Sequence, residues 1–368
     1  MSSGKKYAVI ILTGFFLANC TPSVERYKNK ARKALQNEDS QKALQYLQKA
    51  FELSLDDQFF PLGKNHEYSN LYSPVNRNKM LLVENQPSKV KAYFTVYEIA
   101  RDNDWRRRVK GFIRNVALSP DGHYALLHME QSENVCKIDL WDLQSREQVS
   151  FSGNIPCNES GGVSNTGEVV FIGQNKAVNR FIPDSEKLDE KYIAELPSPP
   201  EKSIPAWGSF QFSPRNHLYL TYGALGLYHL YSVEKGQLKL VNKDAASPKI
   251  FFSYNSDNPG LITGGANNHQ VVFLNVDHSF DEVQSFPVRF WKDAVFLNSS
   301  EYFYIEDERL VYVNNNKEDR LLFWASKVYA DTSGKVYLLS PRGSLIGYNK
   351  VNPSEESKAI FQMGWEIK

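Results

Sequence analysis

The sequence has little cysteine and no excess of charge of either sign. Its 368 residues include only 3 cysteines, and 43 Lys and Arg stand against 42 Asp and Glu. A chain this poor in cysteine is not a small disulfide scaffold. A formal charge of +1 gives no strong field for a polyanion, so we expect no nucleic-acid partner.

Local signatures of catalysis are missing as well. The sequence has no Gly-x-Ser-x-Gly elbow, no Walker A loop and no Gly-x-Gly-x-x-Gly fingerprint. Its seven histidines form no His-Glu-x-x-His pair and accompany no Cys-x-x-Cys, so we expect no metal site. We therefore predict no catalytic residue and no cofactor. A site assembled from one residue of each repeat would leave no such signature, and an enzyme stays the alternative.

The apolar run near the N-terminus is too short for a transmembrane helix. Tyr7–Ala18 spans 12 residues, whereas a helix needs about 20 to cross a bilayer. Lys5 and Lys6 precede this run and Cys20 follows it. This layout is typical of a secretory signal, so we expect the protein to be exported.

The residues Leu17-Ala18-Asn19-Cys20 resemble the lipobox of bacterial lipoproteins. The resemblance implies that residues 1–19 are a signal peptide and that the Cys20 thiol carries a diacylglyceryl group. Asn19 stands where that family usually has Gly, Ala or Ser. Acyl chains contribute about 0.8 kcal/mol per buried methylene, so Cys20 would hold the protein on a membrane. Thr21, rather than Asp, favours the outer membrane or the periplasmic face over the inner membrane. A plain signal peptide that leaves Cys20 free is the alternative.

A helical hairpin is predicted for residues 20–57. Apolar residues recur three and four positions apart on both sides of a break at residues 37–40. They are Ala31, Ala34 and Leu35 before the break and Ala43, Leu44, Leu47, Ala50 and Phe51 after it. The stretch 38–53 resembles the second half of a tetratricopeptide repeat, which implies that Ala43 and Ala50 let two helices approach closely. Such arrays need about three repeats to form a groove, so we expect a spacer or cap, and a peptide-binding groove is the alternative.

After a connector at residues 58–70, the sequence turns to short β-type runs bounded by turn residues. A Ser-centred turn followed by an apolar strand recurs every 34 to 49 residues. The turn serines are Ser73, Ser119, Ser164, Ser213, Ser256, Ser299 and Ser333. Propeller blades repeat at about this period, so residues 71–368 are predicted to form a β-propeller of six to eight blades, with seven preferred.

Two blades carry the resemblance to known propeller families. Leu118–Gly122 and Trp141–Leu143 resemble WD40 repeats, although the dipeptide Gly122-His123 lies inside the turn instead of ahead of it. Val328–Leu339 is similar to a pyrroloquinoline-quinone-type repeat, which a lipoprotein subunit of the outer-membrane assembly machinery uses without cofactor. The fold class is therefore mainly β, a propeller preceded by a short helical hairpin.

The remaining cysteines, Cys136 and Cys157, fall in one predicted blade. Cys136 opens its third strand and Cys157 follows its fourth, and antiparallel pairing brings both to the same end. A structural disulfide is geometrically allowed in an exported protein, and two separate buried thiols are the alternative. The basic run Trp105–Lys110 is predicted to be a solvated turn between strands, and a site for a lipid headgroup or an acidic partner is the alternative.

These features favour a lipid-anchored envelope protein whose propeller is a non-enzymatic interaction scaffold. Its expected partners are the membrane, through acylated Cys20, and another envelope protein. A propeller enzyme of lactonase or quinone-dependent dehydrogenase type, with its site in the central channel, is the alternative. A surface adhesin differs from the scaffold only in the side of the membrane that it occupies.

Overall fold

The computed structural model describes a large part of the chain. The described residues are 24–53, 59–62, 68–86, 91–99, 103–132, 134–174, 176–193, 195–198, 206–224, 226–252, 257–263, 269–275, 282–288, 291–298, 301–306, 309–315, 317–331, 335–339, 343 and 345–349. The expected signal peptide, 1–19, and Leu17, Ala18, Asn19 and Cys20 of the lipobox lie outside them. Of the helices within these ranges, none combines the length and the apolar character that a bilayer span requires.

The chain divides into two units, residues 1–62 with 346–368 and residues 63–345. The first unit contains helices α2 (Val24–Gln36) and α3 (Ser40–Leu53). It also contains strand β1 (Phe59–Leu62) and most of its neighbour in the sheet, β27 (Leu345–Asn349). Strand β1 therefore lies within the range that the sequence predicts as a connector.

Small residues hold the two helices together. Ala31, Leu47 and Ala50 form a buried cluster, with Tyr27 and Tyr46 packed against it. The Asp39 carboxylate accepts a hydrogen bond from the Lys42 N–H at 3.1 Å and so caps the start of α3. A helical hairpin forms where the sequence predicts one, and its likeness to a tetratricopeptide repeat stays a prediction.

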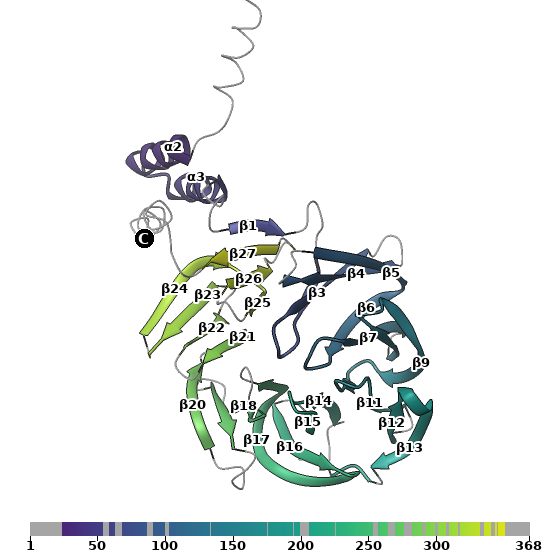
Figure 1. Ribbon diagram of the computed structural model, residues 1–368. Coiled ribbons are helices and arrows are strands. Elements are labelled where there is room, and N and C mark those ends of the chain that lie inside the picture. The colour runs from purple at the N-terminus through teal and green to yellow at the C-terminus, as the bar shows by residue number, and fades with distance from the viewer. Residues whose placement is uncertain are drawn as a thin grey trace, which may run out of the picture. The chain divides into compact units, whose positions relative to one another are not determined.

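The second unit is a ring of antiparallel blades (Figure 1). Blade 1 is β2 (Asn70–Tyr72), β3 (Lys79–Gln86), β4 (Lys91–Glu98) and β5 (Asn103–Lys110). Blade 2 is β6 (Phe112–Leu118), β7 (Tyr124–Ser132), β8 (Val135–Asp142) and β9 (Glu147–Pro156). Blade 3 is β10 (Gly162–Val163), β11 (Val169–Ile172), β12 (Val178–Ile182) and β13 (Lys187–Ile193), with a 3-10 turn at Pro183–Ser185.

Blades 4 and 5 share one strand. Blade 4 is β14 (Trp207–Phe212), β15 (Leu218–Ala224), β16 (Leu227–Glu234) and the first half of β17 (Gln237–Phe252). The second half of β17 opens blade 5, with β18 (Pro259–Thr263), β19 (His269–Leu274) and β20 (Glu282–Val288). The partner of β17 changes from β16 to β18 at Ala245, which pairs with both.

Blade 6 is β21 (Trp291–Asn298), β22 (Glu301–Glu306), β23 (Arg309–Asn314) and β24 (Lys317–Trp324). The hairpin of β25 (Lys327–Ala330) and β26 (Lys335–Leu339) takes the seventh position. The predicted propeller is confirmed, and the blades of the described residues fall within the predicted range of six to eight.

The core lies between the blades. Second strands are buried on both faces because each alternate side chain packs against a different neighbouring blade. In β7, Leu127 joins the cluster with blade 1, whereas Leu126 joins the cluster with blade 3. In β15, Leu220 faces blade 3 and Tyr219 faces blade 5. This arrangement explains why the sequence shows continuous apolar runs instead of alternation.

The basic run Trp105–Lys110 is not a turn, contrary to the prediction. It forms most of β5, the outer strand of blade 1, and Trp105 is buried. Arg106 pairs with Glu84, and its guanidinium lies 3.9 Å from the centre of the Tyr93 ring. An arginine that packs on an aromatic ring and pairs with a carboxylate can be accommodated in a strand. A high density of basic residues in the sequence is therefore not sufficient evidence for a loop.

Candidate functional site

The first strands of the blades enclose a central channel. It holds a cavity of about 550 Å³, lined by residues of β2, β6, β10, β14, β17, β21 and β25. The strand that lies innermost in each blade therefore contributes to one site. A cavity of this size is within the range that small-molecule sites occupy.

One end of the channel is the face that carries the Ser-centred turns. The Ser119, Ser164 and Ser213 hydroxyl oxygens each accept a backbone N–H four or five residues ahead, at 2.9 to 3.0 Å. In blade 7 the corresponding acceptor is Asp331, which takes the Lys335 N–H at 2.9 Å. The predicted turn serine of that blade, Ser333, lies outside the described residues.

These turns are hydrogen-bonded to one another around the ring. The Asn76 amide donates to the Asp121 carbonyl at 2.6 Å, and the Asp121 N–H donates to Asn165 Oδ1 at 2.9 Å. The Asn165 N–H donates to Asn216 Oδ1 at 3.0 Å. The series joins blades 1 to 4. Because each first strand leads into one of these turns, the first strands end on this face of the ring and begin on the opposite face.

A charged cluster lies where three first strands begin. Lys249, Asp293 and Lys327 come from β17, β21 and β25, and all three line the cavity. Lys249 forms an ion pair with Asp293 Oδ1, and the Val328 N–H donates to Asp293 Oδ2 at 3.1 Å. We call these three residues the channel cluster. It contains two ammonium groups and one carboxylate.

The second lysine of the channel cluster, Lys327, is half-buried. Burial lowers the pKa of Lys327, and the Lys249 cation lowers that pKa further, while Asp293 opposes both effects. The positive charge of Lys327 is therefore less stable here than in solvent.

Two polar groups lie toward the turn face of the channel. The Arg77 guanidinium, in the first turn of blade 1, donates to the Phe296 carbonyl of β21. Tyr329, on β25, has a side chain that is 1% exposed, and within the described chain its hydroxyl has no hydrogen-bond partner. Burial raises the pKa of Tyr329 well above its ordinary value, so the phenol remains protonated.

Glu159 is a buried carboxyl group at the channel wall in blade 3. Lys176 Nζ lies 2.9 Å from Glu159 Oε1, and no described residue hydrogen-bonds Oε2. Burial raises the pKa of Glu159 to about 7, and Lys176 only partly opposes that shift. The group can therefore change its charge near neutral pH.

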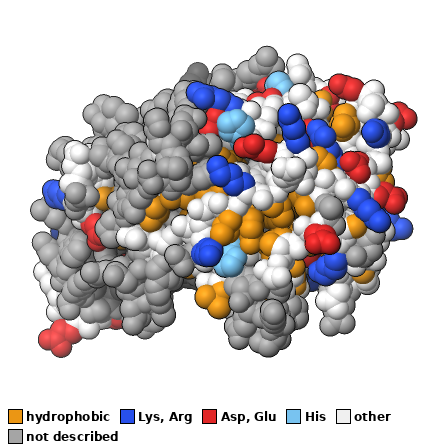
Figure 2. All heavy atoms as spheres, turned by 90° about the horizontal axis from the view of Figure 1, so that it is seen from below, with side chains coloured by type: hydrophobic (Ala, Val, Ile, Leu, Met, Phe, Trp, Pro, Cys, Tyr) orange, Lys and Arg blue, Asp and Glu red, His pale blue; other side chains and the backbone are white. Residues whose placement is uncertain are grey.

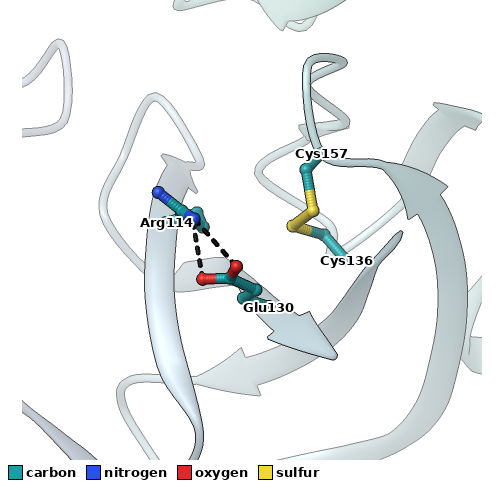
Figure 3. The surroundings of a disulfide bond; sticks show 4 residues. All are labelled: Arg114, Glu130, Cys136 and Cys157. Atoms are coloured by element: carbon teal, nitrogen blue, oxygen red, sulfur yellow. Dashed lines mark hydrogen bonds and ion pairs between the residues drawn. A yellow bond between two sulfur atoms is a disulfide. The ribbon is translucent and has the colours of Figure 1, made fainter. Parts of the chain in front are cut away.

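Cys136 and Cys157 are joined by a disulfide in blade 2 (Figure 3). Their Cα atoms lie 4.9 Å apart, within the range for a bridge. Cys136 is buried near the start of β8, and Cys157 follows β9 and lines the channel cavity. Beside the bridge, Arg114 and Glu130 pair from neighbouring strands at 2.8 Å.

Seen from below Figure 1, the molecule shows an apolar area framed by charged side chains (Figure 2). Separately, the exposed large apolar residues include Leu227 on β16 and Leu240 on β17, at 51% and 41% exposure. Leu240 is paired with Tyr231, so these residues and Leu227 share one face of blade 4. Leu227 and Leu240 are therefore two separate exposed apolar side chains on the same face of blade 4.

Solved structures share the propeller fold. An uncharacterized protein, lmo1340, from Listeria monocytogenes EGD-e has a TM-score of 0.51 at 13% identity over 80% of this chain and 99% of that one. The propeller domain of Cps50 (Swd1) from Myceliophteria thermophila has a TM-score of 0.55 at 9% identity over 79% of this chain and 100% of that one. No family model and no curated protein matches the sequence. At these identities the likeness shows the fold alone.

The sequence missed the channel cluster and Glu159. Their positions, 159, 249, 293 and 327, lie on four blades, and no local motif surrounds them. The only available signal is that each falls near the start of a first strand. In the part of the chain that is described, no three His, Cys, Asp or Glu side chains come together to hold a metal ion.

Proposed function

We propose that this chain is an exported lipoprotein, held on a membrane by acylated Cys20, whose propeller is a non-enzymatic scaffold for another envelope protein. The N-terminal residues 1–20 and the Cys136–Cys157 disulfide both support export, because disulfides persist outside the cytosol. The outer membrane or the periplasmic face is the expected location.

The observation that carries the scaffold proposal is the hydrogen-bonded series of turns on one face of the ring. Asn76, Asp121, Asn165 and Asn216 tie neighbouring blades together through backbone partners. Loops that are already fixed lose little conformational entropy when a partner binds them. Exposed Leu227 and Leu240, on one face of blade 4, give a partner protein two further apolar side chains to contact.

The anchor is tested by Cys20→Ser in the full-length chain. We expect the wild type to stay with the membrane fraction and to partition into detergent, and Cys20→Ser to be released in soluble form. Thr21→Ser, which leaves the thiol in place, is the matched control. Mass spectrometry that finds Cys20 unmodified in the membrane-bound wild type would contradict the proposal.

The partner is tested by cross-linking and purification from detergent-solubilised envelopes. A scaffold should recover one envelope protein in stoichiometric amount. Leu227→Asp with Leu240→Asp tests these two side chains of blade 4, and Leu188→Asp, at an exposed leucine of blade 3, is the control. Recovery of no stoichiometric protein from several growth conditions would count against a scaffold.

The channel cavity is the observation that keeps the enzyme alternative open. A lactonase or a quinone-dependent dehydrogenase would carry a metal or a chromophore in that channel. Elemental analysis and an absorption spectrum of the purified protein decide between the two. A stoichiometric metal or a quinone band would favour the enzyme over the scaffold.

A further inference from the structure

Strand β5 differs from the other outer strands of blades 1 to 6 in the regularity of its pairing. It runs antiparallel to β4 from Lys91 opposite Lys110 to Glu98 opposite Asn103, with no shift in register. The outer strands of blades 2 to 6 each show a shift in register against their inner neighbour. The far side of β5 is the end of its sheet, at the outside of the ring (Figure 1). Strand β5 therefore presents a regular edge about 26 Å long, to whose outward N–H and C=O groups the described chain supplies no strand.

Basic side chains line this edge on both faces of the sheet. Arg107 is exposed on the face of β5 that carries Trp105, which packs in the core between blades 1 and 2. Arg108 and Lys110 are exposed on the opposite face, because side chains alternate along a strand. Asp104, near the start of β5, is the single carboxylate of the strand. Most of the edge is therefore positively charged.

These cations lack acidic partners within the described chain. No described carboxylate forms an ion pair with Arg107, Arg108 or Lys110, and the same is true of exposed Arg146 on the turn between β8 and β9. The guanidinium carbons of Arg107 and Arg146 lie 5.7 and 5.8 Å from the centre of the Trp105 ring. Two cations beside one aromatic ring repel each other, and an acidic side chain between them would remove that repulsion.

The position of these charges selects what can pair with the edge. Charged residues on an edge strand normally keep it from pairing with other strands. A second copy of β5 is repelled, because its charges have the same sign. A lipid bilayer is flat and meets one face of the sheet, whereas the basic residues of β5 lie on both faces. A strand added to β5 places its own side chains beside both faces, so an acidic strand satisfies all of these charges.

We propose that β5 binds an extended, acidic segment of a partner protein, which adds a strand to blade 1. The backbone of the segment hydrogen-bonds the outward edge of β5. Its Asp and Glu side chains pair with Arg107 and Arg146 on one face and with Arg108 and Lys110 on the other. The inference rests on the proposed scaffold function and names the chemistry of the partner.

The test is fluorescence anisotropy of labelled peptides of about ten residues with the purified full chain. Three acidic probes combine Val and Thr with Glu or Asp residues on both faces of a strand. One control replaces Glu and Asp with Gln and Asn, and a second keeps the acidic residues but replaces the others with Pro, which cannot donate to a ladder. We expect at least one acidic probe to bind with 1:1 stoichiometry and both controls to bind at least tenfold more weakly. Affinity should decrease as the salt concentration rises, because salt screens exposed charges.

The variant Arg107→Gln with Arg108→Gln removes one charge from each face and should weaken binding of the acidic probe by tenfold or more. Lys187→Gln with Lys191→Gln, at exposed positions on the outer strand of blade 3, is the matched control and should have no effect. Arg107→Glu with Arg108→Glu should bind a Lys version of the probe in preference to the acidic one. Circular dichroism and thermal unfolding establish that each variant is folded. Equal affinity of the acidic probe for the wild type and folded Arg107→Gln with Arg108→Gln would overturn the proposal.

Hydrogen exchange shows how the probe is bound. An added strand should slow exchange of the backbone N–H groups of residues 103–110 and leave β13 unchanged, because the outward N–H groups of β5 acquire acceptors. An anion held by charge alone gives no such protection. If the bound peptide leaves residues 103–110 unprotected, or if soluble dihexanoylphosphatidylglycerol binds as tightly as the peptide, the edge does not select a strand and the proposal is wrong.

Failure of this surface and failure of the scaffold give different results. If no acidic probe binds while one envelope protein is recovered in stoichiometric amount, the proposed surface is wrong and the scaffold stands. If a probe binds and protects β5 but envelopes yield no protein, the surface is supported and the scaffold fails.

Discussion

Glu159 is a carboxyl group enclosed by protein at the wall of the channel. Only 3% of the residue is exposed, and Lys176 provides its one described ion pair. Its pKa rises from 4.5 to about 7 because burial penalises the charged form. Between these two pH values the folded carboxyl group stays protonated, while the unfolded one ionises. Folding stability is therefore lost as the pH rises through that window.

Glu159→Gln tests this effect, because glutamine has a similar shape but does not ionise. Relative to the wild type, its free energy of unfolding should increase between pH 5 and pH 8 by up to about 3 kcal/mol. Urea unfolding at the two pH values measures the difference. Glu190→Gln, at an exposed position of β13, is the control and should show no such change. A difference that is the same at both pH values would contradict the raised pKa.

At the level of elements, blade 2 is closed by a covalent bond as well as by its strand ladder. The disulfide joins residues 21 apart in sequence, and the intervening chain contains β9. A cross-link of this length restricts the unfolded chain and typically stabilises the folded state by about 2 to 4 kcal/mol. Other blades depend on apolar packing between neighbours and on their turns.

Reduction of the disulfide should therefore destabilise the protein by about 2 to 4 kcal/mol. Guanidinium unfolding of the wild type with and without a thiol reductant measures this loss. The double variant Cys136→Ala with Cys157→Ala should be insensitive to the reductant and should resemble the reduced wild type. An unchanged midpoint of the wild type in reductant would show that the bond does not form in solution.

At the scale of the whole second unit, side-chain and backbone hydrogen bonds also connect segments that are far apart in sequence. Arg77 belongs to blade 1 and donates to the Phe296 carbonyl of blade 6, 219 residues away. Tyr68 and Gly343, near the two ends of this unit, are joined by a backbone hydrogen bond of 2.9 Å. Such links make the opening of one blade costly for others, so the ring should unfold cooperatively.

Arg77→Lys tests this coupling, because it keeps the charge but lacks the planar guanidinium fork. We expect a loss of about 2 kcal/mol, the scale of a buried hydrogen bond from a charged group. Hydrogen exchange should increase in both β21 and blade 1. Arg108→Lys, at an exposed position of β5, is the control. Faster exchange confined to blade 1 would show that the link does not couple the two blades.

Some of these features could be predicted from local sequence. The turns around Ser119, Ser164 and Ser213 have a sequence signature because the hydroxyl oxygen bonds a backbone N–H only a few residues away. The helical hairpin also has a sequence signature, because Ala31, Leu47 and Ala50 belong to apolar positions that recur at the helical period. Trp105–Lys110 was misread, since the partners that hold Arg106 in a strand, Glu84 and Tyr93, belong to other strands.

The sequence by itself determined the repeat, the β class, the hairpin and the export-type N-terminus, because each depends on residues close together along the chain. Only the tertiary structure brought Lys249, Asp293 and Lys327 to one end of a channel and enclosed the Tyr329 hydroxyl where no described residue hydrogen-bonds it. Charge balance and burial at that point depend on which blades meet around the ring. Neither property is encoded in any short segment, so the channel chemistry became visible only in three dimensions.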